Sequence, residues 1–247
     1  MTEGAVILAA GLGSRLGALT ADRPKAMVEV LGRPVIDRAV RALEAAGVRT
    51  ITIITGHRRE AIDAYVAAGD FSADVRTLHN PEFATANNIV SFLVSAPALA
   101  DGGLLLNSDV IFDPAILRDL LAAPAGAWLS VDDTQALDAE DMKVELGPDH
   151  AVRRISKGLD PATARGEYIG LARLDRAAVG ATVAAAEALV RHGGSGLYYE
   201  DAFDRSAAEA GFRIRSTGGA LWTEIDDQRD YERAVAIMST LTTQGRP

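Results

Sequence analysis

The first half of the chain alternates short apolar runs with segments whose apolar residues recur at helical spacing. Apolar runs of this length predict buried strands, and the 3.6-residue periodicity between them predicts helices. Strands are expected at 6–10, 50–55, 75–78 and 103–107, and helices at 34–46, 59–68, 88–96 and 114–121. Because strands separated by helices pair in parallel, this half predicts a doubly wound, mostly parallel, Rossmann-like α/β sheet.

The second half has a different rhythm, with several strands that follow one another without helices. Strands are expected at 127–131, 143–146, 151–156, 168–174 and 213–216, and helices at 178–190, 201–210 and 228–238. The turn Gly147-Pro148-Asp149 predicts an antiparallel hairpin, and Asp227 is a candidate cap for the last helix. We expect these strands to join the same sheet in one domain over residues 1–247. Its halves would be about 1–125 and about 126–240, with a frayed tail at 239–247.

A glycine-rich loop follows the first strand and contains Gly11, Gly13 and Gly17, with Arg15 inside it and Lys25 beyond it. Glycines let a backbone approach a ligand closely, and clustered amide N–H groups bind anions. Two cationic side chains in the same neighbourhood therefore favour a bound polyphosphate over a plain tight turn.

This loop matches neither of the two common phosphate motifs. A P-loop requires Lys and then Ser or Thr directly after its last glycine, whereas Gly13 is followed by Ser14 and Arg15. The dinucleotide fingerprint requires a third glycine where Leu16 stands. An NAD-dependent oxidoreductase is thereby disfavoured.

The composition of the chain limits the kinds of molecule that it is expected to bind. The net charge of −9 disfavours nucleic acid as a ligand, and no apolar run is long enough for a membrane span. The absence of cysteine excludes disulfides and thiolate metal sites and fits a cytoplasmic protein, as does Met1 leading straight into the first strand without a leader. An acidic chain that binds a polyphosphate needs a few placed cations and a metal ion.

Two aspartates are candidates for that metal ion. Asp109 follows the strand at 103–107, and Asp226 follows a short strand that begins at Trp222. Magnesium prefers one or two carboxylates together with phosphate oxygens and water, so the pair predicts bound Mg²⁺. The alternatives are a strand-end turn for Asp109 and helix capping for Asp226.

The opening segment, AVILAAGLGSRLGALTADRPKAMVEVLGRPVID, is similar to that of sugar-nucleotide-type nucleotidyltransferases. Motifs at 87–91, 141–144, 155–157, 199–201 and 222–227 resemble the branch that contains phosphocholine and small-phosphonate cytidylyltransferases. The resemblance covers about residues 4–240 and implies the GT-A-like nucleotidyltransferase fold.

The resemblance also implies roles for individual residues. Backbone contacts to base and ribose would come from Leu8, Ala9, Ala10 and Gly11, and further base or ribose contacts from Asn87 and Asn88. The β- and γ-phosphates would be held by Gly13, Ser14 and Arg15, and the α-phosphate by Lys25. Mg²⁺ would be held by Asp109 and Asp226, and the acceptor phosphate by Lys157 with help from Lys143.

Aromatic and acidic residues in the second half are candidates for binding the head group of the acceptor substrate. They are Tyr168, Tyr198, Tyr199, Phe203 and Trp222, with Glu167, Glu200 and Asp201 among them. Such a mixture suits a cationic head, either a quaternary ammonium or a primary amine. In the alternative interpretation Tyr198 and Phe203 belong to the core and the acids begin helices, and a hydroxyl-bearing phosphonate is left open.

Together with these features, the resemblance implies a Mg²⁺-dependent cytidylyltransferase. It would transfer CMP from CTP to the phosphate or phosphonate of a small acceptor of the phosphocholine, phosphoethanolamine, 2-aminoethylphosphonate or 2-hydroxyethylphosphonate type, releasing pyrophosphate. The alternatives are a sugar-1-phosphate nucleotidyltransferase and a non-catalytic nucleotide-binding protein. The expected partners are CTP and the acceptor, with neither nucleic acid nor membrane, and the residues predict no oligomeric state.

Overall fold

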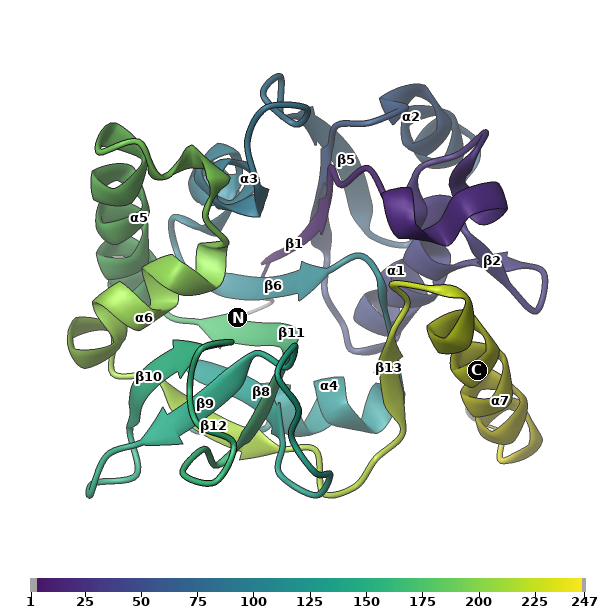
Figure 1. Ribbon diagram of the computed structural model, residues 1–247. Coiled ribbons are helices and arrows are strands. Elements are labelled where there is room, and N and C mark those ends of the chain that lie inside the picture. The colour runs from purple at the N-terminus through teal and green to yellow at the C-terminus, as the bar shows by residue number, and fades with distance from the viewer. Residues whose placement is uncertain (1–3, 246–247) are drawn as a thin grey trace.

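The computed structural model describes residues 4–245 and centres on a nine-stranded sheet (Figure 1). Its strands are β1 (Gly4–Ala9), β4 (Thr50–Thr55), β5 (Asp74–His79), β6 (Gly103–Asn107), β8 (Trp128–Asp132), β9 (Lys143–Leu146), β10 (Val152–Ser156), β11 (Gly166–Leu174) and β12 (Arg213–Ser216). The main path runs β10-β9-β11-β6-β1-β4-β5, with β8 paired to β11 and β12 paired to β8. The predictions for Met1 to Glu3 and for the last two residues of the tail lie outside the described residues.

The parallel half of the sheet is the one that the alternating pattern predicts. Strands β6, β1, β4 and β5 pair in parallel in that order, and Leu8 lies in register with both Ile54 and Asn107. Most of the connections pass through helices, namely α1 (Val35–Ala45), α2 (Arg59–Ala68) and α3 (Asn88–Ser95). The carboxyl ends of β1 and β6 therefore open at the same edge of the sheet, where parallel sheets place their ligands.

The second half extends the same sheet through antiparallel pairing. Strand β11 pairs antiparallel with β6, and the predicted hairpin forms between β9 and β10. Helix α4 (Pro114–Leu121) ends the first half, and helices α5 (Arg176–Arg191) and α6 (Tyr199–Ala210) follow in the second. The fold is thus a mixed α/β sheet with a largely parallel centre, as the sequence predicts.

Successive side chains of β1 point to opposite faces of the sheet, and each face has its own hydrophobic core. Ala5, Ile7 and Ala9 pack with α1, α2 and α4, whereas Val6 and Leu8 pack with α3, α5 and α6. Burial on both faces explains why β1 is apolar throughout, as central parallel strands are.

A third core fixes the C-terminal segment beside the glycine loop. Strand β13 (Trp222–Glu224) pairs with β7 (Val110–Phe112) and leads into α7 (Gln228–Thr243), which Asp227 caps as predicted. Helix α7 extends beyond its predicted end at residue 238, because Leu241 is buried in this core with 1% exposure. Residues 239–243, predicted to fray, are therefore helical.

Short elements complete the chain. They are the 3₁₀ segments η1 (Ser14–Thr20), η2 (Lys25–Met27), η3 (Ala96–Leu99) and η4 (Gly194–Gly196), and a small hairpin of β2 (Glu29–Val30) with β3 (Arg33–Pro34). Across residues 4–245, none of the helices combines the length and the apolar character that crossing a bilayer would require.

Candidate active site

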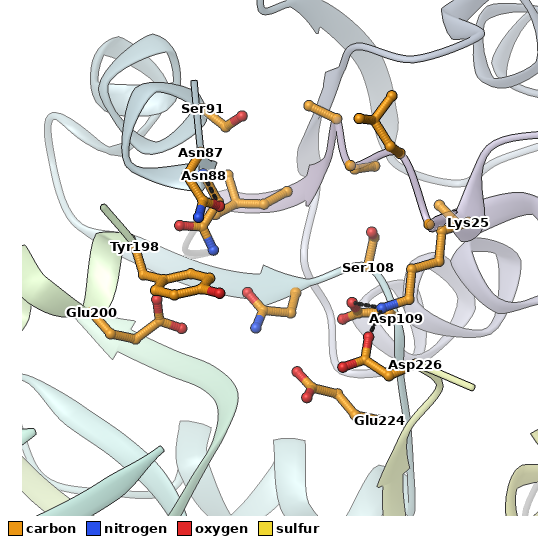
Figure 2. A pocket seen from close by; sticks show the side chains of 18 of the residues that line it. Lys25, Asn87, Asn88, Ser91, Ser108, Asp109, Tyr198, Glu200, Glu224 and Asp226 are labelled. Atoms are coloured by element: carbon orange, nitrogen blue, oxygen red, sulfur yellow. Dashed lines mark hydrogen bonds and ion pairs between the residues drawn. The ribbon is translucent and has the colours of Figure 1, made fainter. Parts of the chain in front are cut away.

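A pocket of about 420 Å³ opens at the carboxyl ends of β1 and β6 (Figure 2). Most of the predicted site residues line it, although they come from segments far apart in the sequence. They are Leu8, Ala9, Ala10, Gly11, Gly13, Arg15, Lys25, Asn87, Asn88, Asp109, Lys157, Glu167, Tyr168, Glu200 and Asp226. The backbone of Ser14 begins η1 beside the pocket, and its side chain lies outside the described part of the structure.

Lys25 is the centre of an ionic cluster on one side of this pocket. Its ammonium lies 2.6 Å from Oδ2 of Asp109 and also donates to Oδ1 of Asp226. Arg15 adds a second cation, with its guanidinium 3.1 Å from the other oxygen of Asp226. Figure 2 shows the ammonium between the two carboxylates. The glycine loop, η2 and the segments after β6 and β13 thus bring four predicted groups together.

The charges of this cluster stabilise one another. Burial alone would lower the pKa of Lys25, but the charges of Asp109 and Asp226 outweigh it and raise the pKa above its ordinary value. For Asp226, burial is likewise outweighed, and Lys25 holds the pKa of the carboxyl below its ordinary value. Lys25 is therefore a permanent cation over the working pH range of an enzyme.

Gly13 sets the distance between the glycine loop and Lys25. Its φ of 64° lies in the left-handed region, and a Cβ added there would lie 2.9 Å from the Cβ of Lys25. Real Cβ atoms essentially never approach one another so closely, so any side chain at this position must displace the lysine. Only glycine satisfies both the backbone and the contact.

Gly13→Ala is accordingly expected to lower kcat/KM about 10-fold, because the displaced Lys25 no longer meets its partners. Gly211→Ala is the matched control. Gly211, at the end of α6, has almost the same left-handed conformation, with φ 63° and ψ 34° against 64° and 32° for Gly13, but a Cβ there would meet nothing within 4 Å. Both variants carry backbone strain of about 1 kcal/mol in unfolding free energy, but only Gly13→Ala should lose activity. Equal activity losses in steady-state kinetics would contradict the assigned contact.

Glu224 is a third acid near Lys25. Its position falls within the motif at 222–227, but no role is predicted for it from the sequence. It lies on β13 and lines the pocket, and burial together with the charge of Asp109 raises its pKa to about 8. A signal was present in the sequence, since Glu224 and Asp226 are two residues apart and such residues share a face of an extended segment.

The carboxylates around Lys25 fit a divalent cation only in part. Oδ1 of Asp109 is buried and has no hydrogen-bond partner among residues 4–245, as expected of an oxygen that awaits a ligand. Within the same residues, no group of three or more His, Asp or Glu side chains converges closely enough to hold a metal ion. Asp109 and Asp226 could therefore hold Mg²⁺ together with oxygens from a bound substrate, which is the coordination that Mg²⁺ prefers.

Asn87 and Asn88 line the pocket and also fix its wall. Oδ1 of Asn87 caps α3, and Oδ1 of Asn88 accepts a 2.8 Å hydrogen bond from the backbone N–H of Tyr199. The backbone N–H of Asn87 donates to the carbonyl of Ser195. The pair thereby ties the start of α3 to the start of α6.

The opposite end of the pocket carries the candidate groups for the acceptor. Lys157 lies with its ammonium 5.7 Å from the centre of the Tyr198 ring and 3.6 Å from a carboxylate oxygen of Glu140. Glu200 is 5% exposed, and burial raises its pKa to about 7. Figure 2 shows Glu200 and Tyr198 across the pocket from Lys25.

Lys143 and Trp222, both predicted to bind the acceptor, do not reach this pocket. Lys143 is 1% exposed, and its ammonium donates to the carbonyls of residues 138, 139 and 141 at 2.7, 3.2 and 3.1 Å. Trp222 is buried, and its indole N–H donates to Asp132 at 2.7 Å. The structure thus assigns the lysine to holding a loop and the indole to anchoring β13 against β8.

Tyr199 and Asp201 are likewise placed outside the pocket. Tyr199 is fully buried against Phe92 and Phe203, and its hydroxyl donates to Tyr168. Asp201 accepts the backbone N–H of Tyr198 in a capping box at the start of α6. Both side chains shape the wall on which Glu200 lies, and neither is directed to a ligand.

Comparisons with known proteins identify relatives along most of the chain. Over 242 residues it is 31% identical to the CMP-5'-(3-aminopropyl)phosphonate synthase of Streptomyces rubellomurinus, across 93% of this chain and 38% of that protein. Over 116 residues it is 34% identical to the choline-phosphate cytidylyltransferase of Streptococcus pneumoniae, across 47% of this chain and 49% of that protein. The matched segments thus cover less than half the length of each of these two curated relatives.

Solved structures share the fold. The CTP:phosphocholine cytidylyltransferase of Streptococcus pneumoniae superposes with a TM-score of 0.76 at 24% identity, over 96% of this chain and 99% of that chain. The inositol-1-phosphate CTP transferase of T. maritima gives a TM-score of 0.80 at 20% identity, over 96% of each chain. The family described as the MobA-like NTP transferase domain matches residues 5–191, and the chain belongs to this nucleotidyltransferase family.

Proposed function

We propose that this chain is a cytidylyltransferase that transfers CMP from CTP to the phosphate or phosphonate group of a small acceptor, releasing pyrophosphate. The observation that carries the proposal is the position of Lys25, which joins the glycine loop to Asp109 and Asp226 inside one pocket. That pocket has a second, acid-lined end with room for an acceptor. The names of the relatives support cytidine and a phosphonate or phosphocholine acceptor.

The reaction needs no general base, because a phosphate or phosphonate oxygen is already an anion. This oxygen attacks the α-phosphorus in line, a new P–O bond forms, and the bond to the β-phosphate oxygen breaks to release pyrophosphate. The barrier arises from bringing two anions together and from the negative charge that develops on the transferring group. Lys25, Arg15 and the amides of the glycine loop would neutralise this charge. The remaining rate acceleration would come from holding the acceptor oxygen and the α-phosphorus in line.

Mg²⁺ belongs to the proposal as a cofactor that Asp109 and Asp226 would hold. When bound, the ion would neutralise phosphate charge and orient the triphosphate. Lys25 now bridges both carboxylates, so the lysine must transfer from them to the phosphates as substrate arrives. This exchange moves a cation to the point where charge develops.

A pyrophosphate-release screen tests the proposed function. CTP, ATP, GTP and UTP would each be paired, with Mg²⁺, with phosphocholine, phosphoethanolamine, 2-aminoethylphosphonate, 2-hydroxyethylphosphonate and glucose 1-phosphate. We expect turnover with CTP and a small phosphate or phosphonate. Turnover with glucose 1-phosphate alone would instead favour the sugar-1-phosphate alternative, and no turnover with any pair would reject the proposal.

A further inference from the structure

Glu200 is a buried acid that faces the pocket without a charged partner. It is 5% exposed and lines the pocket, and its Oε2 has no hydrogen-bond partner among the described residues. Within residues 4–245, no lysine, arginine or histidine forms an ion pair with it. The Tyr199 hydroxyl and a backbone N–H hold the pKa of Glu200 down in part, but no cation in the described part of the chain does so. A buried carboxylate without a cation is unfavourable, so a side chain of this kind at a ligand pocket indicates a cation supplied by the ligand.

The aromatic side chains described at this end do not form a cage. Tyr168 is 3% exposed and its hydroxyl is engaged by Tyr199, whereas Phe83 lies near His57 and His79, beyond the ends of β4 and β5. Tyr198 offers an open ring at 42% exposure, and Lys157 lies over it. A quaternary ammonium has no N–H and depends on several aromatic faces, which the described lining of this pocket does not supply.

A primary ammonium matches the groups that are present. It donates three hydrogen bonds, and Oε2 of Glu200 is an unused acceptor within residues 4–245. Lys157 lines the same pocket as the catalytic cluster, with its ammonium over the Tyr198 ring, and its charge contributes to the lowered pKa of Asp226. A zwitterion could therefore place its ammonium at Glu200 and its anion between Lys157 and Lys25.

We propose that the acceptor is an aminoalkyl phosphonate or phosphate with a free primary amine, and that Glu200 accepts a hydrogen bond from its ammonium group. This inference rests on the proposed cytidylyltransferase function. Glu200 would then be the residue that favours an acceptor with a primary amine over one with a hydroxyl or a trimethylammonium group. The atom responsible would be Oε2 of its carboxylate.

The test compares three acceptors that differ only at the head: 2-aminoethylphosphonate, its N,N,N-trimethyl derivative and 2-hydroxyethylphosphonate. We expect kcat/KM to be about 30-fold higher for the amine than for either analogue. A factor of this size is what the loss of one hydrogen bond to a charged group typically costs. Glu200→Gln should remove this preference chiefly through KM of the amine, while KM for CTP is unchanged. Glu209→Gln, an exposed acid on the same helix, is the control for folding and should keep the preference.

Calorimetric binding of the same three compounds separates this inference from the proposed function. If the protein binds the amine most tightly, loses this preference in Glu200→Gln, and turns over no nucleotide, the proposed function is rejected and the ligand class is supported. Turnover with CTP at equal kcat/KM for all three heads, or a Glu200→Gln loss that is equal for all three, would overturn the inference alone.

Discussion

Lys25→Ala is expected to lower kcat for pyrophosphate release about 1,000-fold. Among residues 4–245 the lysine is the one cation that contacts both Asp109 and Asp226, and its displacement onto the triphosphate is the electrostatic step of the proposed mechanism. Removal of one well-placed donor to a developing anion costs a factor of this size. Single-turnover measurements with saturating CTP would separate the chemical step from nucleotide binding.

The same variant has a second readout that does not depend on activity. Without Lys25, the carboxylates of Asp109, Asp226 and Glu224 lose the cation that now neutralises them. The nucleotide-free variant should therefore bind Mn²⁺ about 10-fold more tightly than the unmodified protein, since the ion no longer competes with an ammonium. Electron paramagnetic resonance of free Mn²⁺ would measure this.

Two further variants control for general effects. Lys25→Arg keeps the charge and should keep weak Mn²⁺ binding while losing turnover, because a planar guanidinium does not reproduce the compact ammonium. Arg229→Ala, at an exposed position of α7, should behave as the unmodified protein in both assays. Unchanged turnover in Lys25→Ala would show that the lysine has no part in the mechanism. Unchanged Mn²⁺ binding would show that the ammonium does not compete with the metal ion for the carboxylates.

The strand ends were predictable from sequence because burial and polarity change abruptly there. β1 is apolar until it opens into the glycine loop, and β6 ends at Asn107 with Asp109 beyond it. Since parallel strands carry their ligands at one edge, the order of β1 and β6 is enough to predict that the glycine loop and Asp109 lie together. Asp226 follows β13, which pairs antiparallel with β7 outside the main sheet, so its approach to Lys25 could be expected only from the resemblance of the segment 222–227.

Other side chains could not be assigned in this way because their partners depend on tertiary structure. The N–H of Trp222 binds Asp132, ninety positions away in the sequence, and this pair exists only because β13 packs beside β8. Lys143 is surrounded by three carbonyls of one loop whose conformation no local pattern encodes. A polar or aromatic residue in an acceptor-binding half looks the same in sequence whether it binds a ligand or a loop.

Glu167, which lines the pocket, is expected to make the free energy of unfolding depend on pH. It lies on β11 in register with Asp132 and Lys143, and within residues 4–245 it forms no ion pair. Burial, together with the charges of Asp141 and Asp132, raises its pKa from 4.5 to about 8. The folded protein therefore holds a proton at Glu167 that the unfolded chain releases near its ordinary pKa.

The sign of the resulting pH dependence follows from proton binding. Between about pH 4.5 and pH 8 the folded state binds more protons than the unfolded state, so Glu167 makes stability fall as pH rises through this window. Below the window the carboxyl is protonated in both states and contributes nothing to the slope. Above it the carboxyl is ionised in both states, and the whole penalty of the buried charge is present.

Glu167→Gln is therefore expected to stabilise the protein, and to do so mainly at the higher pH. The gain in unfolding free energy should be about 1 kcal/mol or less at pH 5 and on the order of 3 kcal/mol at pH 8. Urea unfolding at both values measures it, with the exposed Glu187→Gln on α5 as the control that should show no gain. An equal gain at both pH values would mean that packing, not charge, is the cause. A gain confined to the higher pH would show that the Glu167 carboxylate opposes folding once it is ionised, as a charge held at a pocket without an ion pair is expected to do.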